Sequence, residues 1–305
     1  MNSHFNIVGI GEVLWDLLPS GPQLGGAPAN FTCHARALGA EARLVSRVGD
    51  DEFGSEIFAR LGALGVWTDC ITTDALHPTG TVGVELDAGQ PRYVIHEDAA
   101  WDFIEASPCA LAAVGAADAV CFGTLAQRSA ASRGAIRTLI GHVRSSSPGA
   151  LRVCDVNLRQ QFFSREIVGS SLALANVVKL NDAELPVLAG MLSLKGNPRA
   201  QIAELAEHYS LRLVVLTRGA QGSVILDGRS GDWDEHAGIA AEVADTIGAG
   251  DSFTAATVLG VLNGWPLARI NAFANEVAAF VCSRHGATPE LPERFREGSG
   301  RKPLQ

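Results

Sequence analysis

The chain has 305 residues, of which 47% are hydrophobic and 19% are charged, and its formal net charge is −9. This composition favours a large folded core and excludes a mostly disordered chain. The acidic balance excludes a general nucleic-acid-binding surface, which needs clusters of basic side chains, but it is compatible with a local site for an anionic ligand.

The first half of the chain alternates between strand and helix patterns. Short apolar runs predict buried strands over 5–10 and 42–48, and helical spacing predicts helices over 31–38 and 52–64. A segment rich in glycine and proline, 24–30, precedes the first helix. Residues 79–96 alternate around a turn-prone centre, which predicts a β-hairpin.

The second half continues the alternation. It predicts strands over 117–123, 151–157, 176–181 and 211–217, and helices over 129–143, 198–209, 249–263 and 267–283. Strands that alternate with helices indicate a parallel sheet covered on both faces. The hairpin interrupts this order, and we expect it to form a small β lid over the mouth of the sheet. The polar segment 293–305 is predicted to be a loose tail.

The six cysteines include no C-x-x-C pair, and most lie in apolar surroundings. We therefore expect reduced, buried thiols in a cytoplasmic protein. The first residues lack the basic and apolar regions of a signal peptide, and no apolar run is long enough to cross a bilayer. These features predict no membrane partner.

The segment DTIGAGD, residues 245–251, carries the strongest chemical signal. Gly248, Ala249 and Gly250 let the backbone approach a ligand, and the helix that follows adds free N–H groups and the positive end of its dipole. Asp251 lies on the first turn of that helix. An anion hole beside a carboxylate suits phosphoryl transfer to an alcohol, with Asp251 as the base; a helix N-cap is the alternative interpretation.

DTIGAGDSF resembles the C-terminal signature of the ribokinase-like, or PfkB, carbohydrate kinases, and residues 24–54 resemble their N-terminal signature, a double glycine followed by asparagine and a helix. The likeness extends over residues 8–292. It implies a ribokinase-like three-layer α/β sandwich with a central, mainly parallel sheet. One kinase domain would span 1–292, with its β lid formed by about 12–24 and 78–98.

The resemblance also implies roles for individual residues. Asp251 matches the family's catalytic base, and the amides of Gly248, Ala249 and Gly250 match its anion hole. The implied sugar ligands are Asp16 in GEVLWD, Gly25, Gly26 and Asn30 in GGAPAN, and Arg159 in DVNLR. Arg159 would meet either the sugar or a phosphate, and a surface ion pair is the alternative for this residue. Asp and Asn suit vicinal hydroxyls because they accept and donate hydrogen bonds.

For the nucleotide, NDAE resembles the family's N-x-x-E motif, whose Asn181 and Glu184 would place Mg²⁺ and the phosphates of ATP largely through water. A helix N-cap is the alternative, and both can hold at once. The implied contacts with the nucleotide come from Thr217, Gly219 and Gly222 in LTRGAQGS and from Asn275. A potassium site would use Asp245 and the carbonyl groups of Ile247 and Gly286.

GGAPAN, GEVLWD and DVNLR resemble fructokinases most, which implies transfer of the γ-phosphoryl group of ATP to a primary hydroxyl of D-fructose. Ribose, 2-keto-3-deoxygluconate or a nucleoside stays open as the substrate, as does a non-catalytic sugar sensor on the same fold. A homodimer through the lid is expected from the family. An oxidoreductase is disfavoured because VGIGEV has Leu14 where a dinucleotide fingerprint needs its third glycine.

Overall fold

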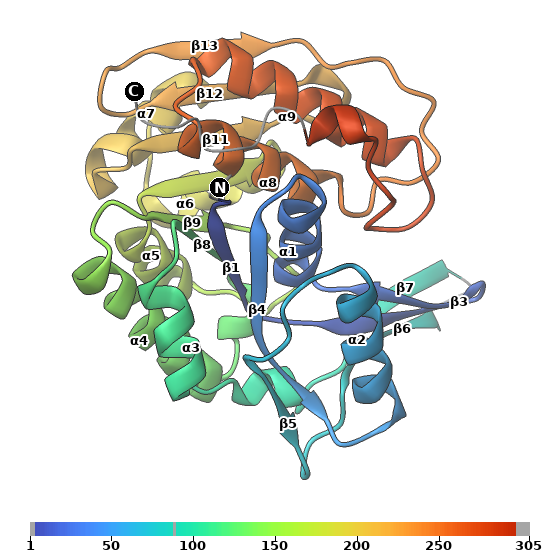
Figure 1. Ribbon diagram of the computed structural model, residues 1–305. Coiled ribbons are helices and arrows are strands. Elements are labelled where there is room, and N and C mark those ends of the chain that lie inside the picture. Colours follow the sequence, from blue (N-terminus) through green and yellow to red (C-terminus); the bar gives the residue numbers. More distant parts are fainter. Residues whose placement is uncertain (1–3, 88–89, 297–305) are drawn as a thin grey trace.

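A mainly parallel sheet is the middle layer of the computed structural model, which describes residues 4–87 and 90–296 (Figure 1). Its parallel strands are β1 (Asn6–Ile10), β4 (Glu41–Gly49), β5 (Ile71–Asp74), β8 (Ala119–Phe122), β9 (Leu151–Asp155), β10 (Val177–Asn181) and β11 (Leu213–Thr217). Two antiparallel strands, β12 (Ser223–Asp227) and β13 (Trp233–His236), extend one edge. The order is β13-β12-β11-β10-β9-β8-β1-β4-β5. The apolar, buried strands require cover on both faces.

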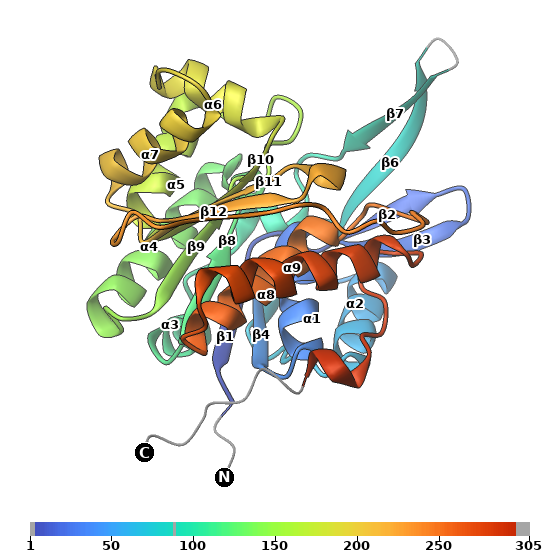
Figure 2. The same cartoon turned by 90° about the horizontal axis from the view of Figure 1, so that it is seen from above.

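Helices supply that cover in two layers, seen from above in Figure 2. One face carries α1 (Ala27–Ala37), α8 (Ala249–Leu262) and α9 (Leu267–Cys282), and the other carries α3 (Pro108–Gly115), α4 (Ala130–Ser146), α5 (Arg165–Leu174), α6 (Glu184–Leu192) and α7 (Pro198–Tyr209). Helix α2 (Glu52–Ala63) packs on β4 in a smaller core cluster. The predicted three-layer α/β sandwich with a central, mainly parallel sheet is therefore confirmed.

Helix α8 differs from its neighbours because side chains all round it are buried, from Ser252 to Val261. Such a helix belongs to a core rather than to a surface layer. It packs between α1 and α9 on the sheet, so its first turn has a fixed place relative to the ends of the strands.

A second sheet projects from the body (Figure 2). Its strands β2 (Leu14–Leu18), β3 (Gly21–Gly25), β6 (Gly80–Asp87) and β7 (Gln90–Ile95) follow the order β3-β2-β6-β7. These strands come from the two segments predicted to form the β lid, so the small sheet is present, and its action as a lid stays a prediction. Strands β3 and β7 are its edges, and the pairing of two chains through them stays a prediction.

Short 3-10 turns complete the description: η1 (Ala100–Phe103), η2 (Leu125–Gln127), η3 (Gly219–Gln221) and η4 (Glu293–Phe295). Turn η4 lies within the segment predicted to be a loose tail, but it is packed: Phe295 is only 2% exposed and contacts α9 residues. An aromatic side chain in an otherwise polar segment is enough to anchor it to a core. The rest of that tail lies outside the described residues. Within the described ranges, no helix has the length and apolar character needed to span a membrane.

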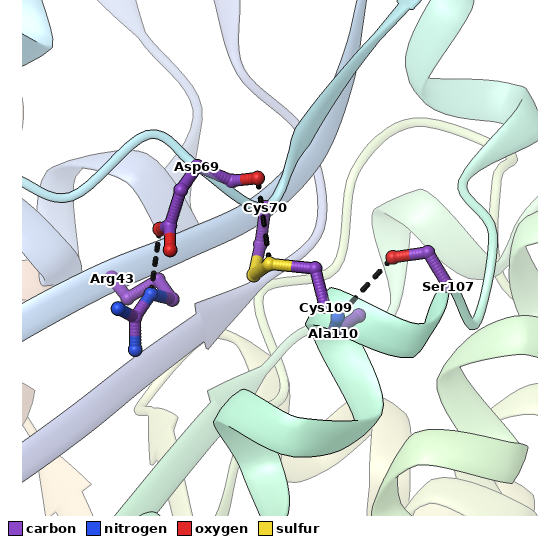
Figure 3. The surroundings of a disulfide bond; sticks show 6 residues. All are labelled: Arg43, Asp69, Cys70, Ser107, Cys109 and Ala110. Atoms are coloured by element: carbon purple, nitrogen blue, oxygen red, sulfur yellow. Dashed lines mark hydrogen bonds and ion pairs between the residues drawn. A yellow bond between two sulfur atoms is a disulfide. The ribbon is translucent and has the colours of Figure 1, made fainter.

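A disulfide between Cys70 and Cys109 contradicts the prediction that all six cysteines are reduced (Figure 3). Cys70 stands just before β5, and Cys109 lies in the first turn of α3. The chain separates them by 39 residues, so the pairing arises from tertiary packing that local cysteine spacing cannot reveal. The segment between them carries β6 and β7 of the lid, which the disulfide closes into a loop. The other four cysteines are free.

We expect the Cys70→Ser, Cys109→Ser double variant to unfold at lower urea concentration than the wild type. The chain-entropy model assigns about 4 kcal/mol to a cross-link that closes a loop of this size. Urea unfolding with and without dithiothreitol measures the loss. The double variant serves as the control, since dithiothreitol should not change its urea midpoint. A wild type whose midpoint is also unchanged by dithiothreitol would contradict the disulfide.

Candidate active site

Two cavities meet at the first turn of α8. The first, which we call the lid cavity, has a volume of about 480 Å³ and lies under the small sheet, where Leu14, Val82 and Ile95 line it. The second, called the loop cavity, has a volume of about 750 Å³ and lies beside the loop that carries Gly238 and Val243. Within 246–251, Ile247, Gly248 and Asp251 line the lid cavity, and Thr246, Ala249 and Gly250 line the loop cavity. A group transferred between ligands in the two cavities would therefore pass this turn.

The carboxyl ends of parallel strands supply most of the polar groups around the cavities. Glu12 follows β1, Arg159 follows β9, Asn181 ends β10 and Thr217 ends β11. Ligands of open α/β sheets bind at this edge because the loops that connect strands to helices gather there. The fold therefore brings together residues that stand up to 205 positions apart in the sequence.

The turn before α8 needs glycine at position 248. Gly248 has φ 78°, and a Cβ atom there would lie 2.1 Å from the carbonyl oxygen of Ala287. Within the described chain, the N–H groups of Gly248, Gly250 and Asp251 find no acceptor, whereas that of Ala249 reaches the Thr246 carbonyl at 3.4 Å. Two of the three residues predicted for the anion hole, Gly248 and Gly250, thus keep free N–H groups at the positive end of the helix dipole, and Asp251 adds a third. That these donors bind an anion stays a prediction.

Asp251 sits at the bottom of the lid cavity and is held by α1. The side-chain amide of Asn30 donates a hydrogen bond of 2.9 Å to its Oδ2. The pKa of Asp251 is raised to about 6, because burial and then the nearby Asp155 carboxylate raise it more than Asn30, Lys179 and Arg159 lower it. A carboxylate with this pKa accepts a proton readily near neutral pH.

A buried cation, Lys179, lies beneath the anion hole and was missed in the sequence. Its Nζ donates to Asp155 at 3.1 Å and would be 3.0 Å from a Cβ atom at Gly250. Asp155 also accepts from Thr254 at 3.0 Å. Burial lowers the pKa of Lys179, but three surrounding carboxylates outweigh that effect and raise it above the ordinary value. The lysine therefore stays charged. The sequence signal that could have revealed it is a lone Lys within the apolar run NVVKLN.

The predicted sugar ligands converge in the lid cavity. Asp16, Gly26, Asn30 and Arg159 line it, and Gly25 packs behind Asp16, where an added Cβ atom would lie 2.3 Å from the carboxylate. Burial raises the pKa of Asp16 to about 6, against the opposing charge of Arg159.

Glu12 was missed in the sequence although it also lines the lid cavity. It is 1% exposed, and burial raises its pKa to about 7. In the described part of the chain its Oε2 has no hydrogen-bond partner, and neither has Oδ1 of Asn30. Buried acceptors without donors are costly, so both atoms are suited to receive hydrogen bonds from a ligand.

The predicted nucleotide contacts converge in the loop cavity, which is lined by Asn181, Thr217, Gly219, Gly222 and Asn275. Glu184 does not line it. Its carboxylate accepts from the N–H groups of Leu158 at 2.9 Å and Asn181 at 2.8 Å, and Asn181 in return accepts from the N–H of Glu184. This reciprocal pair is a capping box at the start of α6, the alternative interpretation of the motif.

The three residues predicted to bind potassium lie together near the turn before α8, and their role toward a cation stays a prediction. The carboxylate of Asp245 accepts from the N–H of Ile247 at 3.0 Å and from the N–H of Gly286 at 3.3 Å. These two bonds hold the segment after α9 against the turn before α8. Oxygen atoms from a carboxylate and nearby backbone carbonyls are the donors that hard cations prefer.

Free N–H groups above a buried lysine and beside a carboxylate lie between two cavities at the carboxyl edge of a parallel sheet, an arrangement that suits phosphoryl transfer to an alcohol. Comparison with known families agrees: residues 22–294 match the pfkB family carbohydrate kinase model. The chain therefore belongs to the PfkB family and is a carbohydrate kinase.

Individual relatives are distant but cover almost the whole chain. A fructokinase from Escherichia coli is 29% identical over 93% of this chain and 95% of its own length. A sugar kinase from Pyrococcus horikoshii, solved in complex with ATP, is 27% identical with a TM-score of 0.79 and covers 96% of this chain and 98% of its own. A fructokinase from Vibrio cholerae, solved with fructose, ADP and calcium ion, has a TM-score of 0.80 at 22% identity. The match covers 97% of this chain and 99% of the V. cholerae chain, and it supports the fold.

We expect kcat/KM for the sugar to fall as the pH drops below about 6, because protonated Asp251 cannot accept the hydroxyl proton and protonated Asp16 is a poorer acceptor. Asn30→Ala removes a bond that stabilises charged Asp251, so its acidic limb should move to higher pH. Steady-state rates across the acidic range measure both effects.

Asn263→Ala is the matched control, since this amide caps the far end of α8 with a bond to Leu259 of 2.8 Å. Its pH profile should match the wild type. An acidic limb near pH 4, the ordinary value for an aspartate, would contradict the burial of the base.

Proposed function

We propose that this carbohydrate kinase transfers the γ-phosphoryl group of ATP to a primary hydroxyl of D-fructose. The observation that carries the proposal is the position of Asp251, where the two cavities join, with free N–H groups beside it and Asn30 holding its carboxylate. The sugar would occupy the lid cavity and ATP the loop cavity. The curated fructokinase of E. coli, similar along nearly its whole length, supports fructose as the acceptor.

In this mechanism Asp251 accepts the proton of the attacking hydroxyl as the oxygen forms its bond to phosphorus. The N–H groups of Gly248, Gly250 and Asp251 stabilise the charge on the transferred group, and Lys179 adds a fixed positive charge beneath them. These donors are in place before reaction because α8 is buried on all sides. The protein therefore reorganises little during transfer.

Mg²⁺ would neutralise phosphate charge beside the loop cavity. Both oxygens of Glu184 are occupied by backbone N–H groups, so this residue would act on the metal through water, and Asn181 borders the cavity. A site with few direct protein ligands fits Mg²⁺, which retains waters and binds phosphate oxygens. K⁺ would bind at Asp245 and the carbonyls of Ile247 and Gly286.

The charges in the lid cavity favour a neutral polyol over a sugar acid. Three carboxyl groups, from Glu12, Asp16 and Asp251, face one cation, Arg159. A substrate carboxylate would meet net negative charge in a partly desolvated site, where repulsion is strong. The unpartnered acceptors Glu12 Oε2 and Asn30 Oδ1 instead match hydroxyl donors.

The small sheet would act as a lid. Apolar side chains from three of its strands, including Leu14, Val82 and Ile95, line the sugar side of the cavity. Closing them over the substrate would exclude water, which would otherwise compete with the sugar for the phosphoryl group.

Asp251→Asn should slow turnover by on the order of 10²–10⁴-fold and leave ATP affinity nearly unchanged, because only the proton acceptor is lost. ADP release and a binding titration with ATP measure the two quantities. Asp232→Asn, an exposed loop carboxylate, is the control and should behave like the wild type. Near-normal turnover of the Asp251 variant would refute its role.

A sugar panel tests the acceptor. With ATP, Mg²⁺ and K⁺, D-fructose should give the highest kcat/KM among D-fructose, D-ribose and 2-keto-3-deoxygluconate. Asp16→Ala should raise the sugar KM by about tenfold or more, as expected when a charged hydrogen-bond acceptor is lost, with little change in the KM for ATP. Preference for the sugar acid would overturn the charge argument, and tight sugar binding without ADP release would indicate a sensor.

A further inference from the structure

His34 is a buried, titratable side chain that has no role in the mechanism above. It lies four residues after Asn30 on α1, so both side chains project from one face of the helix. Asn30 bonds to Asp251, and Nε2 of His34 lies 2.9 Å from the carbonyl oxygen of Ala287. The side chain is 1% exposed, and this contact crosses 253 positions of the sequence.

The partner of His34 determines which nitrogen carries the proton. A carbonyl oxygen only accepts, so Nε2 must donate. Burial lowers the pKa of His34 to about 4, which keeps the ring neutral with its single N–H on Nε2. The bond therefore persists over the pH range in which Asp251 and Asp16 ionise.

The same carbonyl oxygen touches the anion hole. Ala287 is 5% exposed, and its oxygen would lie 2.1 Å from a Cβ atom at Gly248, so the two backbones are in contact. Asp245 adds a second connection through its bonds to the N–H groups of Ile247 and Gly286. The segment 284–288 and the turn 245–248 thus form one packed unit, and His34 joins it to α1.

We propose that His34 is a positioning residue for phosphoryl transfer: by holding the Ala287 carbonyl, it sets the distance between the anion hole at Gly248 and the sugar-binding face of α1. The proposal rests on the proposed kinase function. Transfer requires the donors of α8 and the substrate on α1 to align within a fraction of an ångström, and a misplacement of 1 Å can cost about 10²-fold in rate. Loss of the bond would leave the Ala287 oxygen buried without a donor, and the segment would shift to find one.

Two variants separate this role from simple packing. His34→Leu fills a similar volume without a donor, and His34→Gln keeps an N–H donor at a similar reach. We expect the Leu variant to lose about 10- to 100-fold in kcat with the KM for ATP within about twofold, and the Gln variant to keep most of the rate. Phe31→Leu, a change in the α1 core next to His34, is the control for lost stability without lost positioning.

A second measurement does not depend on turnover. Amide hydrogen exchange over 245–250 and 284–288 should be faster in His34→Leu than in the wild type and close to wild type in His34→Gln. If the Leu variant loses thermal stability as Phe31→Leu does but keeps both its kcat and its exchange pattern, His34 is only a packing residue. A wild type inactive on every sugar would refute the proposed function alone, because the exchange comparison still decides the role of His34.

Discussion

The site depends on the burial of α8. A helix surrounded by sheet, α1 and α9 cannot tilt or slide without disrupting both neighbours, so its N-terminus is a fixed electrostatic feature. Its free N–H groups open between two cavities rather than into bulk water, where their field would be weakened. Gly248 makes this possible, because any side chain would collide with the backbone at Ala287 and push the turn away from the strand ends.

Carboxylates gather near the positive N-terminal end of α8, and a neighbouring cation balances their charge. Asp251, Asp155 and Glu184 supply these carboxylates, and their mutual repulsion would favour protonation if no cation were present. Lys179 supplies that cation from β10, where its ammonium group bonds to Asp155 and lies close to Gly250. The same group offsets carboxylates in the resting state, and in the proposed mechanism it also faces the phosphoryl charge that develops during transfer.

A feature could be predicted from the sequence when its signal lies within a few neighbouring residues. The glycine turn with Asp251 and the apolar strands were predictable because their requirements lie within a few residues. Helices α3 and α5 were not proposed, since short segments with a weak periodic pattern resemble loops. Lys179 and Glu12 acquire meaning only from neighbours that the fold supplies, as does the Cys70–Cys109 pair. Glu184 shows that one motif can be read as capping and as metal placement, and its backbone contacts favour capping in this state.

If the sugar occupies the lid cavity, as proposed, its selection is the least local property, because this cavity takes its walls from both sheets. Asn30 faces it from α1, Arg159 from the end of β9, and Val82 from a strand that the Cys70–Cys109 loop carries. A substitution in any of these elements changes the shape of one pocket, so similar catalytic turns can serve different sugars. The proposed catalytic geometry, in contrast, is confined to α8 and the residues that touch its first turn. Evolution of acceptor specificity can therefore proceed in the lid and the strand ends while the transfer chemistry stays intact.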